Sequence, residues 1–275
     1  MLKVRLISAA VALLVMFAVL FSPTTDIFPI FASIFASFAI VELYTAVGVA
    51  KHWSFLLMGI FTAVAISYLP YLLKLTHENT QIAMLMLFVY LLLLFVIYLL
   101  RFKTITFGEI AIVFLSAVYI SFFLAHILFT RLLPNGNIII LFIFAGAFMT
   151  DTFAYFSGML LGKHKLCPSI SPNKTVEGAI GGLLGVTVFF VILGSCVHVF
   201  GAYTINYINL TILGLLCGVT AQIGDLSASL IKRQYNIKDF GNIMPGHGGV
   251  LDRFDSLLFV APTVYYFVLF FNILK

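Results

Sequence analysis

The feature that most constrains this 275-residue sequence is a succession of apolar runs, each about as long as a bilayer is thick. A helix needs about 20 apolar residues to cross the hydrocarbon core of a membrane. Nine runs reach this length: 4–22, 27–50, 54–75, 81–100, 106–129, 137–160, 177–200, 207–231 and 256–274. Only 9% of the residues are charged, against about 25% in soluble domains. We therefore expect an all-α integral membrane protein of about nine transmembrane helices, a single polytopic domain over residues 1–275.

The distribution of Lys and Arg predicts how these helices are oriented. With a cytoplasmic N-terminus, twelve cations lie at cytoplasmic helix ends: Lys3, Arg5, Lys51, Arg101, Lys103, Lys163, Lys165, Lys174, Lys232, Arg233, Lys238 and Arg253. Three lie at the opposite ends: Lys74, Arg131 and Lys275. Positive charge accumulates on the cytoplasmic side of membrane proteins, so both longer loops, 161–176 and 232–255, are expected in the cytoplasm. No basic stripe lies outside the spans, and nucleic-acid binding is not expected.

Predicted spans contain the acidic residues Glu42, Asp151 and Asp225. Asp225 precedes Lys232 by seven residues, which places it ~10 Å from the cytoplasmic helix end. Intramembrane acids are costly and usually functional, so we expect a polar cavity that faces the cytoplasm. Glu42 could pair with a cation across helices or line this cavity. Asp151, which we expect to be buried, could bind a metal, support a metal ligand or pair with a cation.

The segment 224–233 places three polar side chains on one helix face. Asp225 and Ser229 are four residues apart, and Lys232 follows three residues later. One interpretation is a metal ligand, Asp225, beneath groups that bind phosphate. The alternative is an ordinary helix end, from which Lys232 and Arg233 extend to the membrane interface.

The segment 245–255 is rich in glycine and runs into the last predicted span. Glycines let backbone N–H groups approach an anion, and a helix N-terminus favours one. Asp252 and Asp255 are three residues apart and share a side of the helix start, so with Asp225 they could hold Mg²⁺. The alternative is that both acids only complement the helix dipole. His247 could donate to a phosphate or be a solvated loop residue.

The segment 171–178 reads S-P-N-K-T-V-E-G and precedes the seventh span. Ser171 or Thr175 could cap that helix, and Pro172 suits a helix start. Lys174 at the same place could bind a phosphate. The glycines that follow would let another helix approach closely, and we assign packing to them: Gly178, Gly181, Gly182 and Gly185.

Residues 229–255 resemble the signature of the phosphatidate cytidylyltransferase family, also called CDP-diacylglycerol synthases. The signature is S-x-x-K-R-x-x-x-x-K-D-x-G-x-x-x-P-x-H-G-G-x-x-D-R-x-D. Every fixed position is present: Ser229, Lys232, Arg233, Lys238, Asp239, Gly241, Pro245, His247, Gly248, Gly249, Asp252, Arg253 and Asp255. The segments around Asp151 and 171–178 resemble the family more loosely, and the first 140 residues only in hydropathy and in V-E-L at 41–43.

The resemblance implies that CTP and phosphatidate react to give CDP-diacylglycerol and pyrophosphate. It also implies Mg²⁺ bound by Asp225 and Asp252, a second, monovalent cation such as K⁺, a homodimer and a bacterial inner membrane. The catalytic part would cover about 150–260. Within it we expect Lys232, Arg233 and Arg253 to bind phosphates, and Asp255 and Asp239 to support ligands or orient cations. The expected substrate-binding residues also include Ser171, Lys174, Ser229, Lys238, His247 and Asp151.

Other functions remain open at this point. Related enzymes could be cytidylyltransferases that act on ether lipids, or lipid kinases that use CTP as the phosphate donor. The D-G-x-x-A-R pattern of CDP-alcohol phosphotransferases is absent. A secondary transporter would also carry intramembrane acids, although such proteins place them near the midplane in repeated, broken helices. A lipid-binding scaffold without catalysis would not need so much charge in one loop.

Overall fold

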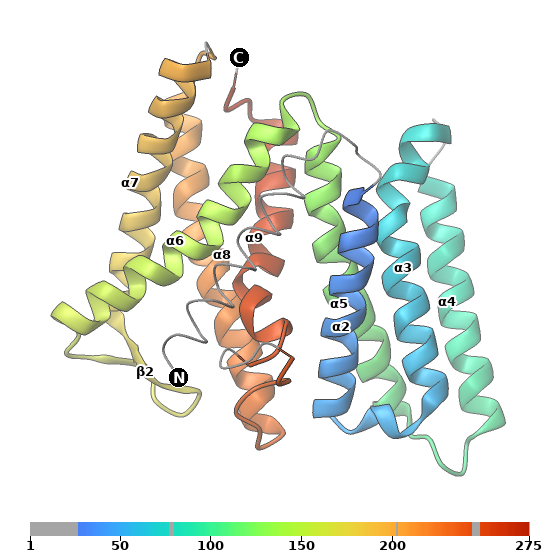
Figure 1. Ribbon diagram of the computed structural model, residues 1–275. Helices are drawn as coiled ribbons and strands as arrows, with labels where there is room; N and C mark the ends of the chain where they lie inside the picture. The colour runs from blue at the N-terminus through green and yellow to red at the C-terminus, as the bar shows by residue number, and fades with distance from the viewer. Residues whose placement is uncertain (1–26, 77–79, 202, 244–247, 275) are drawn as a thin grey trace. The chain divides into compact units, whose positions relative to one another are not determined.

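Eight long helices account for most of the residues that the computed structural model describes, which are 27–76, 80–201, 203–243 and 248–274 (Figure 1). They are α2 (Ile27–Ala46), α3 (Trp53–Thr76), α4 (Thr80–Leu100), α5 (Phe107–Arg131), α6 (Gly136–Leu161), α7 (Val176–Gly201), α8 (Tyr207–Gln234) and α9 (Leu251–Phe270). Each is long and apolar enough to cross a membrane. This confirms a predominantly helical, multi-pass integral membrane protein. The first predicted span, 4–22, lies outside the described residues.

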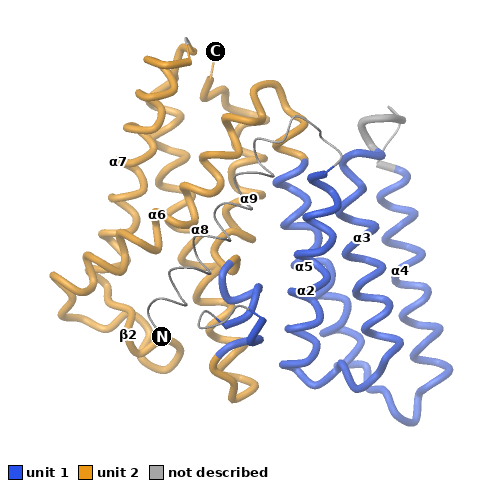
Figure 2. Tube along the Cα trace, in the orientation of Figure 1, with its two compact units in different colours: residues 1–128, 239–253 blue, residues 129–238, 254–275 orange. Residues whose placement is uncertain are grey.

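The chain divides into two compact units, which Figure 2 distinguishes by colour. Unit 1 comprises residues 1–128 and 239–253, and unit 2 comprises 129–238 and 254–275. Within unit 1, α2 packs against α3 and α3 against α4. Within unit 2, α6, α7 and α8 pack against one another. The predicted catalytic part, about 150–260, thus draws residues from both units, and its extent stays a prediction.

Helix α2 supplies much of the core of unit 1. Ile40 and Tyr44 are fully buried, and the Tyr44 hydroxyl donates to the carbonyl of Val113 on α5 at 2.9 Å. The helix ends at Ala46, four residues before the predicted boundary at 50. Gly48 adopts a left-handed φ of 80°, and a short 3₁₀ helix, η1 (Val49–Lys51), follows. Because glycine adopts this conformation without strain, it ends α2 inside an apolar run.

Close packing of α6 on α7 positions the polar residues of unit 2. A Cβ on Gly182 would lie 2.9 Å from both the Thr150 carbonyl oxygen and the Ala154 Cβ. Gly178, Gly181 and Gly185 meet α6 in the same way, through Ala154, Ser157 and Phe153 respectively. The predicted packing role of these four glycines is confirmed, since a side chain at any of them would separate the helices.

The segment before α7 differs from the prediction. Lys165–Cys167 (β1) and Ser171–Thr175 (β2) form an antiparallel hairpin, with Lys165 opposite Thr175 (Figure 1). Ser171 and Pro172 are therefore strand residues and do not begin the helix. Proline is tolerated here because a two-stranded hairpin consists only of edge strands. Thr175 does cap α7 as predicted: its hydroxyl oxygen accepts from the Gly178 N–H at 3.1 Å.

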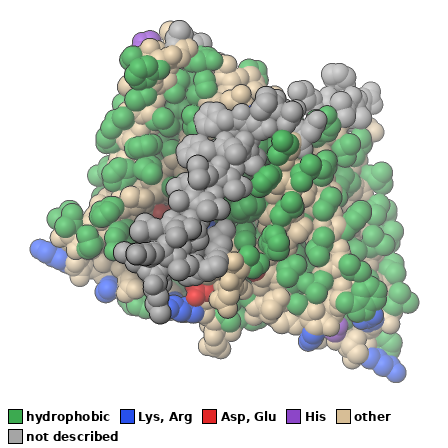
Figure 3. All heavy atoms as spheres, viewed as in Figure 1, with side chains coloured by type: hydrophobic (Ala, Val, Ile, Leu, Met, Phe, Trp, Pro, Cys, Tyr) green, Lys and Arg blue, Asp and Glu red, His purple; other side chains and the backbone are tan. Residues whose placement is uncertain are grey.

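The helix surfaces are those expected of a protein in lipid. Hydrophobic side chains cover most of the visible helix surface, and Lys and Arg gather at helix ends (Figure 3). Helix α4 exposes large apolar residues along its length, including Met84, Phe88, Leu99 and Leu100. A helix that is apolar on every side and still exposed suits a bilayer and not water.

Candidate functional site

Three carboxylates of unit 2 form an acidic cluster, which comprises Asp151, Asp225 and Asp255. The negative charge of Asp225 acts electrostatically on both Asp151 and Asp255. They come from α6, α8 and α9. The sequence predicted a function for each of these residues, and the structure brings them together within one unit.

A cation from the hairpin meets this cluster. Lys174 Nζ on β2 forms an ion pair with Asp225 Oδ2. The Ser229 hydroxyl lies 3.5 Å from Asp225 Oδ1, the distance limit of a hydrogen bond. Lys232, one turn further along α8, acts electrostatically on Asp255. The predicted polar stripe of Asp225, Ser229 and Lys232 is therefore present, and Lys174 joins it from another element.

The carboxylates of the acidic cluster differ in exposure. The side chains of Lys174 and Asp225 are 26% and 27% exposed, so they are half-buried and within reach of a solute. Asp255 is buried, and its Oδ1 accepts from the Ser256 N–H at 2.8 Å. Asp151 is exposed, which contradicts the expectation that it is buried in its span. Its Oδ2 accepts from the Ser256 hydroxyl at 3.1 Å.

Two further contacts fix the hairpin that carries Lys174. Arg233 Nε donates to the carbonyl of Ile170, in the hairpin turn, at 3.0 Å. Glu177 in the first turn of α7 accepts from the backbone N–H groups of Lys163 and His164, and its Oε1 lies 2.6 Å from His164 Nδ1. The Nε donor of Arg233 thus stabilises the fold. Its predicted phosphate binding and that of Ser171, at the start of β2, stay predictions.

Sequence reasoning missed Ser256 and Glu177 as site-supporting residues. Ser256 directly follows Asp255, but nothing in its spacing shows that its hydroxyl reaches Asp151 on another helix. Glu177 lies in a segment that the sequence did single out, yet its partners there are backbone groups on the other side of the hairpin. Contacts of this kind, between residues distant in the sequence, leave no pattern in the residue types.

The start of α9, in unit 1, is held by two carboxylates. Asp252 Oδ2 accepts from the N–H groups of Phe240 at 2.8 Å and Gly249 at 3.0 Å. Glu42 on α2 accepts from the N–H groups of Val250 and Leu251, each at 2.9 Å. Glu42 thus binds backbone groups at the start of α9, and the expectations that it pairs with a cation or lines the cavity stay predictions.

The expectation that this glycine-rich segment binds a substrate anion through its backbone stays a prediction. The N–H groups of residues 249–251 do bind anionic groups, but these are carboxylates of the chain itself. Asp252 accepts from the N–H group of Gly249 at this helix start, and its role as a metal ligand stays a prediction. Residues 244–247, with the predicted donor His247, lie outside the described residues. Lys238, Asp239 and Arg253 are exposed, and their predicted roles in substrate binding and in orienting ligands stay predictions.

The carboxylate oxygens of the acidic cluster suit a hard cation, such as Mg²⁺, whose coordination is completed by substrate phosphates. Among the described residues, no group of three or more His, Cys, Asp or Glu side chains has the arrangement of a metal site. Mg²⁺, however, is usually held by one or two carboxylates, with water and substrate phosphates completing its coordination. The half-buried carboxylate of Asp225 fits that mode. Joint binding of one ion by Asp225 and Asp252 stays a prediction.

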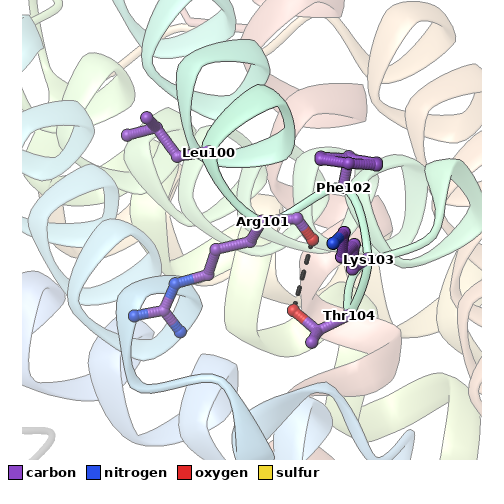
Figure 4. A pocket seen from close by; sticks show the side chains of 5 residues that line it. All are labelled: Leu100, Arg101, Phe102, Lys103 and Thr104. Carbon is purple, nitrogen blue, oxygen red and sulfur yellow. Dashed lines mark hydrogen bonds between the residues drawn. The ribbon is translucent and has the colours of Figure 1, made fainter.

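A pocket at the turn between α4 and α5 takes no part in this assignment. Its lining is Leu100, Arg101, Phe102, Lys103 and Thr104 (Figure 4). The Thr104 hydroxyl donates to the Arg101 carbonyl at 3.2 Å, and the Arg101 guanidinium lies 5.7 Å from the centre of the Trp53 ring. An Arg over an indole and a Lys at a helix end are the usual anchors at a membrane interface.

Comparison with known proteins assigns the chain to a family. Residues 3–271 match the model of the cytidylyltransferase family. The phosphatidate cytidylyltransferase of Bacillus subtilis (strain 168) is 43% identical over 171 residues, which are 62% of each chain. Those of Staphylococcus haemolyticus (strain JCSC1435) and Staphylococcus aureus (strain COL) are 36% and 35% identical over 264 residues, 95% of this chain and 97% of theirs. The chain therefore belongs to the cytidylyltransferase family.

Proposed function

We propose that this protein is a phosphatidate cytidylyltransferase, which transfers CMP from CTP to phosphatidate and releases pyrophosphate. The observation that carries the proposal is the acidic cluster with its paired lysine, whose carboxylates lie on the helices of a membrane protein of this family. The reaction joins two strongly anionic molecules, one of which is a lipid. A half-buried array of both charge signs within a membrane protein is what such a reaction needs.

The reaction requires positioning and charge neutralisation more than proton transfer. The phosphate of phosphatidate is largely ionised near neutral pH, so it can attack without a strong general base. Its oxygen forms a new bond to the α-phosphorus of CTP. The bond from that phosphorus to the oxygen bridging the α- and β-phosphates breaks, and pyrophosphate leaves with the electron pair. Transfers of this kind depend mainly on alignment and electrostatics.

The residues of unit 2 supply cations for this purpose. Lys174 is held beside Asp225, and the contact of Arg233 with Ile170 keeps the hairpin of Lys174 attached to the end of α8. In the proposal, Lys174 and Lys232 reduce the repulsion between the two substrate phosphates. Mg²⁺ bound by Asp225 and Asp252 would supply further neutralisation at the α-phosphorus and the leaving group. A monovalent ion such as K⁺ beside it belongs to the same proposal.

The membrane setting follows from the lipid substrate. The acyl chains of phosphatidate stay in the bilayer while its headgroup reaches the polar residues, and CTP arrives from the cytoplasm. The excess of Lys and Arg at one set of helix ends supports that orientation. We propose the inner membrane of a bacterium as the location and a homodimer as the assembly.

Product analysis with purified protein tests this function. The protein is supplied with CTP labelled in the cytidine, Mg²⁺ and phosphatidate, and label is measured in the chloroform-soluble fraction. We expect lipid-bound label when phosphatidate is supplied. A lipid kinase would transfer only the γ-phosphate, so the cytidine label would remain in water-soluble CDP. Counterflow of labelled CTP in liposomes without lipid product would indicate a transporter and contradict the proposal.

A further inference from the structure

Glu42 is an acid in the apolar helix α2, four residues before the helix ends at Ala46, and the proposed function gives it no role. Its side chain is buried, at 4% exposure. Its two carboxylate oxygens accept from Val250 N and Leu251 N, each at 2.9 Å, across a sequence separation of more than 200 residues. A buried intramembrane carboxylate is costly, so its presence calls for a specific reason.

Glu42 shares the start of α9 with Asp252. Three consecutive N–H groups, those of Gly249, Val250 and Leu251, end on the carboxylates of these two acids. The first N–H groups of a helix have no acceptors within the helix and carry partial positive charge. Glu42 therefore satisfies the two donors that adjoin the one satisfied by Asp252. The same Asp252 oxygen also accepts from Phe240, which joins the loop to the helix start.

The backbone at Gly241 and Gly249 lies close to the Glu42 side chain. A Cβ on Gly249 would lie 2.7 Å from Glu42 Cδ, and a Cβ on Gly241 would lie 2.8 Å from Glu42 Cγ. Both distances are too short for carbon atoms in contact, so only glycine lets the backbone approach the carboxylate this closely. The close approach of Glu42 thus explains why Gly241 and Gly249 of the signature have no side chain, although Glu42 itself lies outside the signature.

We propose that Glu42 is a positioning residue of the reaction, which holds the start of α9 so that Asp252 and Arg253 project from a fixed backbone. This inference rests on the proposed function, in which Asp252 and Arg253 act on metal and phosphate. Glu42 itself touches neither substrate. A shift of about 1 Å at a reacting group can cost on the order of 100-fold in rate, so a contact of this kind matters even at a distance.

The test compares Glu42→Gln and Glu42→Leu with a matched control, Tyr44→Phe. Gln keeps one carbonyl acceptor, and Leu keeps none. Tyr44 lies on the same helix and is also buried, but its hydroxyl bonds to Val113 on α5 and not to α9. Loss of the Tyr44 hydroxyl removes a buried hydrogen bond between helices. We expect it to lower stability as the Glu42 substitutions do, without affecting the start of α9.

The first measurement is amide hydrogen exchange of the peptide that spans residues 248–255, without CTP, Mg²⁺ or lipid. We expect exchange ~10-fold faster or more in Glu42→Leu, an intermediate rate in Glu42→Gln and the wild-type rate in Tyr44→Phe. The second is steady-state kinetics on the folded fraction. We expect kcat to fall by ~10- to 100-fold in the order Gln, then Leu, with KM for phosphatidate unchanged.

The outcomes separate this inference from the proposed function. If the wild-type protein forms no lipid product, the proposed function fails, and with it the role of Glu42 in that reaction. If the wild type is active and Glu42→Gln has wild-type exchange over 248–255 and wild-type kcat, the inference alone is overturned. Should neither Glu42 variant fold, Gly249→Ala displaces the carboxylate from the other side. Faster exchange over 248–255 in that variant supports the inference, and unchanged exchange contradicts it.

Discussion

Lys174 on the β-hairpin pairs with Asp225 on α8, so two residues from separate polar segments of the sequence form one charge pair. The pair is about three-quarters buried. A lysine and a carboxylate at this depth need each other in the absence of ligand, since an unpaired charge there would be poorly solvated. In the proposed function, substrate phosphate would replace Asp225 as the partner of Lys174, and Mg²⁺ would replace Lys174 as the partner of Asp225.

Replacing Lys174 tests the cationic half. We expect Lys174→Met to lower kcat/KM for CTP by on the order of 100-fold, because a positive charge beside the reacting phosphates is lost. Lys174→Arg should retain part of the activity. The matched control is Lys165→Met, which removes an exposed lysine from the neighbouring strand and should leave the kinetics unchanged. Wild-type kinetics in Lys174→Met would exclude a role for this cation.

Replacing Asp225 tests the anionic half. We expect Asp225→Asn to reduce product formation by on the order of 100-fold and to raise the Mg²⁺ concentration needed for half-maximal rate. Stabilisation of the protein by Mg²⁺, followed by thermal unfolding without substrate, should weaken in parallel. Thr211→Val on the same helix serves as control, because the half-buried Thr211 hydroxyl donates to the Tyr207 carbonyl of its own helix and to no group of the acidic cluster. Full activity of Asp225→Asn at low Mg²⁺ would contradict the metal role.

The contact of α6 with α7 is tested by a methyl group. Gly182→Ala places a Cβ 2.9 Å from the Thr150 carbonyl oxygen, a backbone atom that cannot move freely. We expect a loss of about 1–3 kcal/mol in the free energy of unfolding in detergent, as for other overpacked sites. At Gly108 on α5 the nearest atom would be 3.9 Å away, so Gly108→Ala should cost nothing. Equal effects of the two substitutions would disprove close packing at Gly182.

The spans could be predicted because their signal is local. The predicted span 137–160 corresponds to the helix Gly136–Leu161, and the predicted span 81–100 to the helix Thr80–Leu100. Length and hydropathy suffice here, since a bilayer demands both and allows few alternatives to a helix. The same local signal recovered the polar stripe on α8, where Asp225 and Ser229 are four residues apart.

Helix ends and pairings could not be predicted where distant residues decide them. Helix α9 begins at Leu251, five residues before the predicted boundary at 256, because Glu42 and Asp252 satisfy the N–H groups of a segment whose charges indicate a loop. The hairpin was missed because S-P-N-K-T fits a helix start as well as a strand. Asp225 and Lys174 were both identified, but nothing in the sequence indicates that they meet.

The central claim is that CMP, and not the terminal phosphate, passes from CTP to phosphatidate. The most direct measurement supplies CTP labelled at either the α- or the γ-phosphorus and follows both labels. We predict that the α-label enters the chloroform-soluble lipid while the γ-label appears in pyrophosphate, one pyrophosphate for each lipid formed. Transfer of the γ-label to lipid, or consumption of CTP without labelled lipid, would contradict the account.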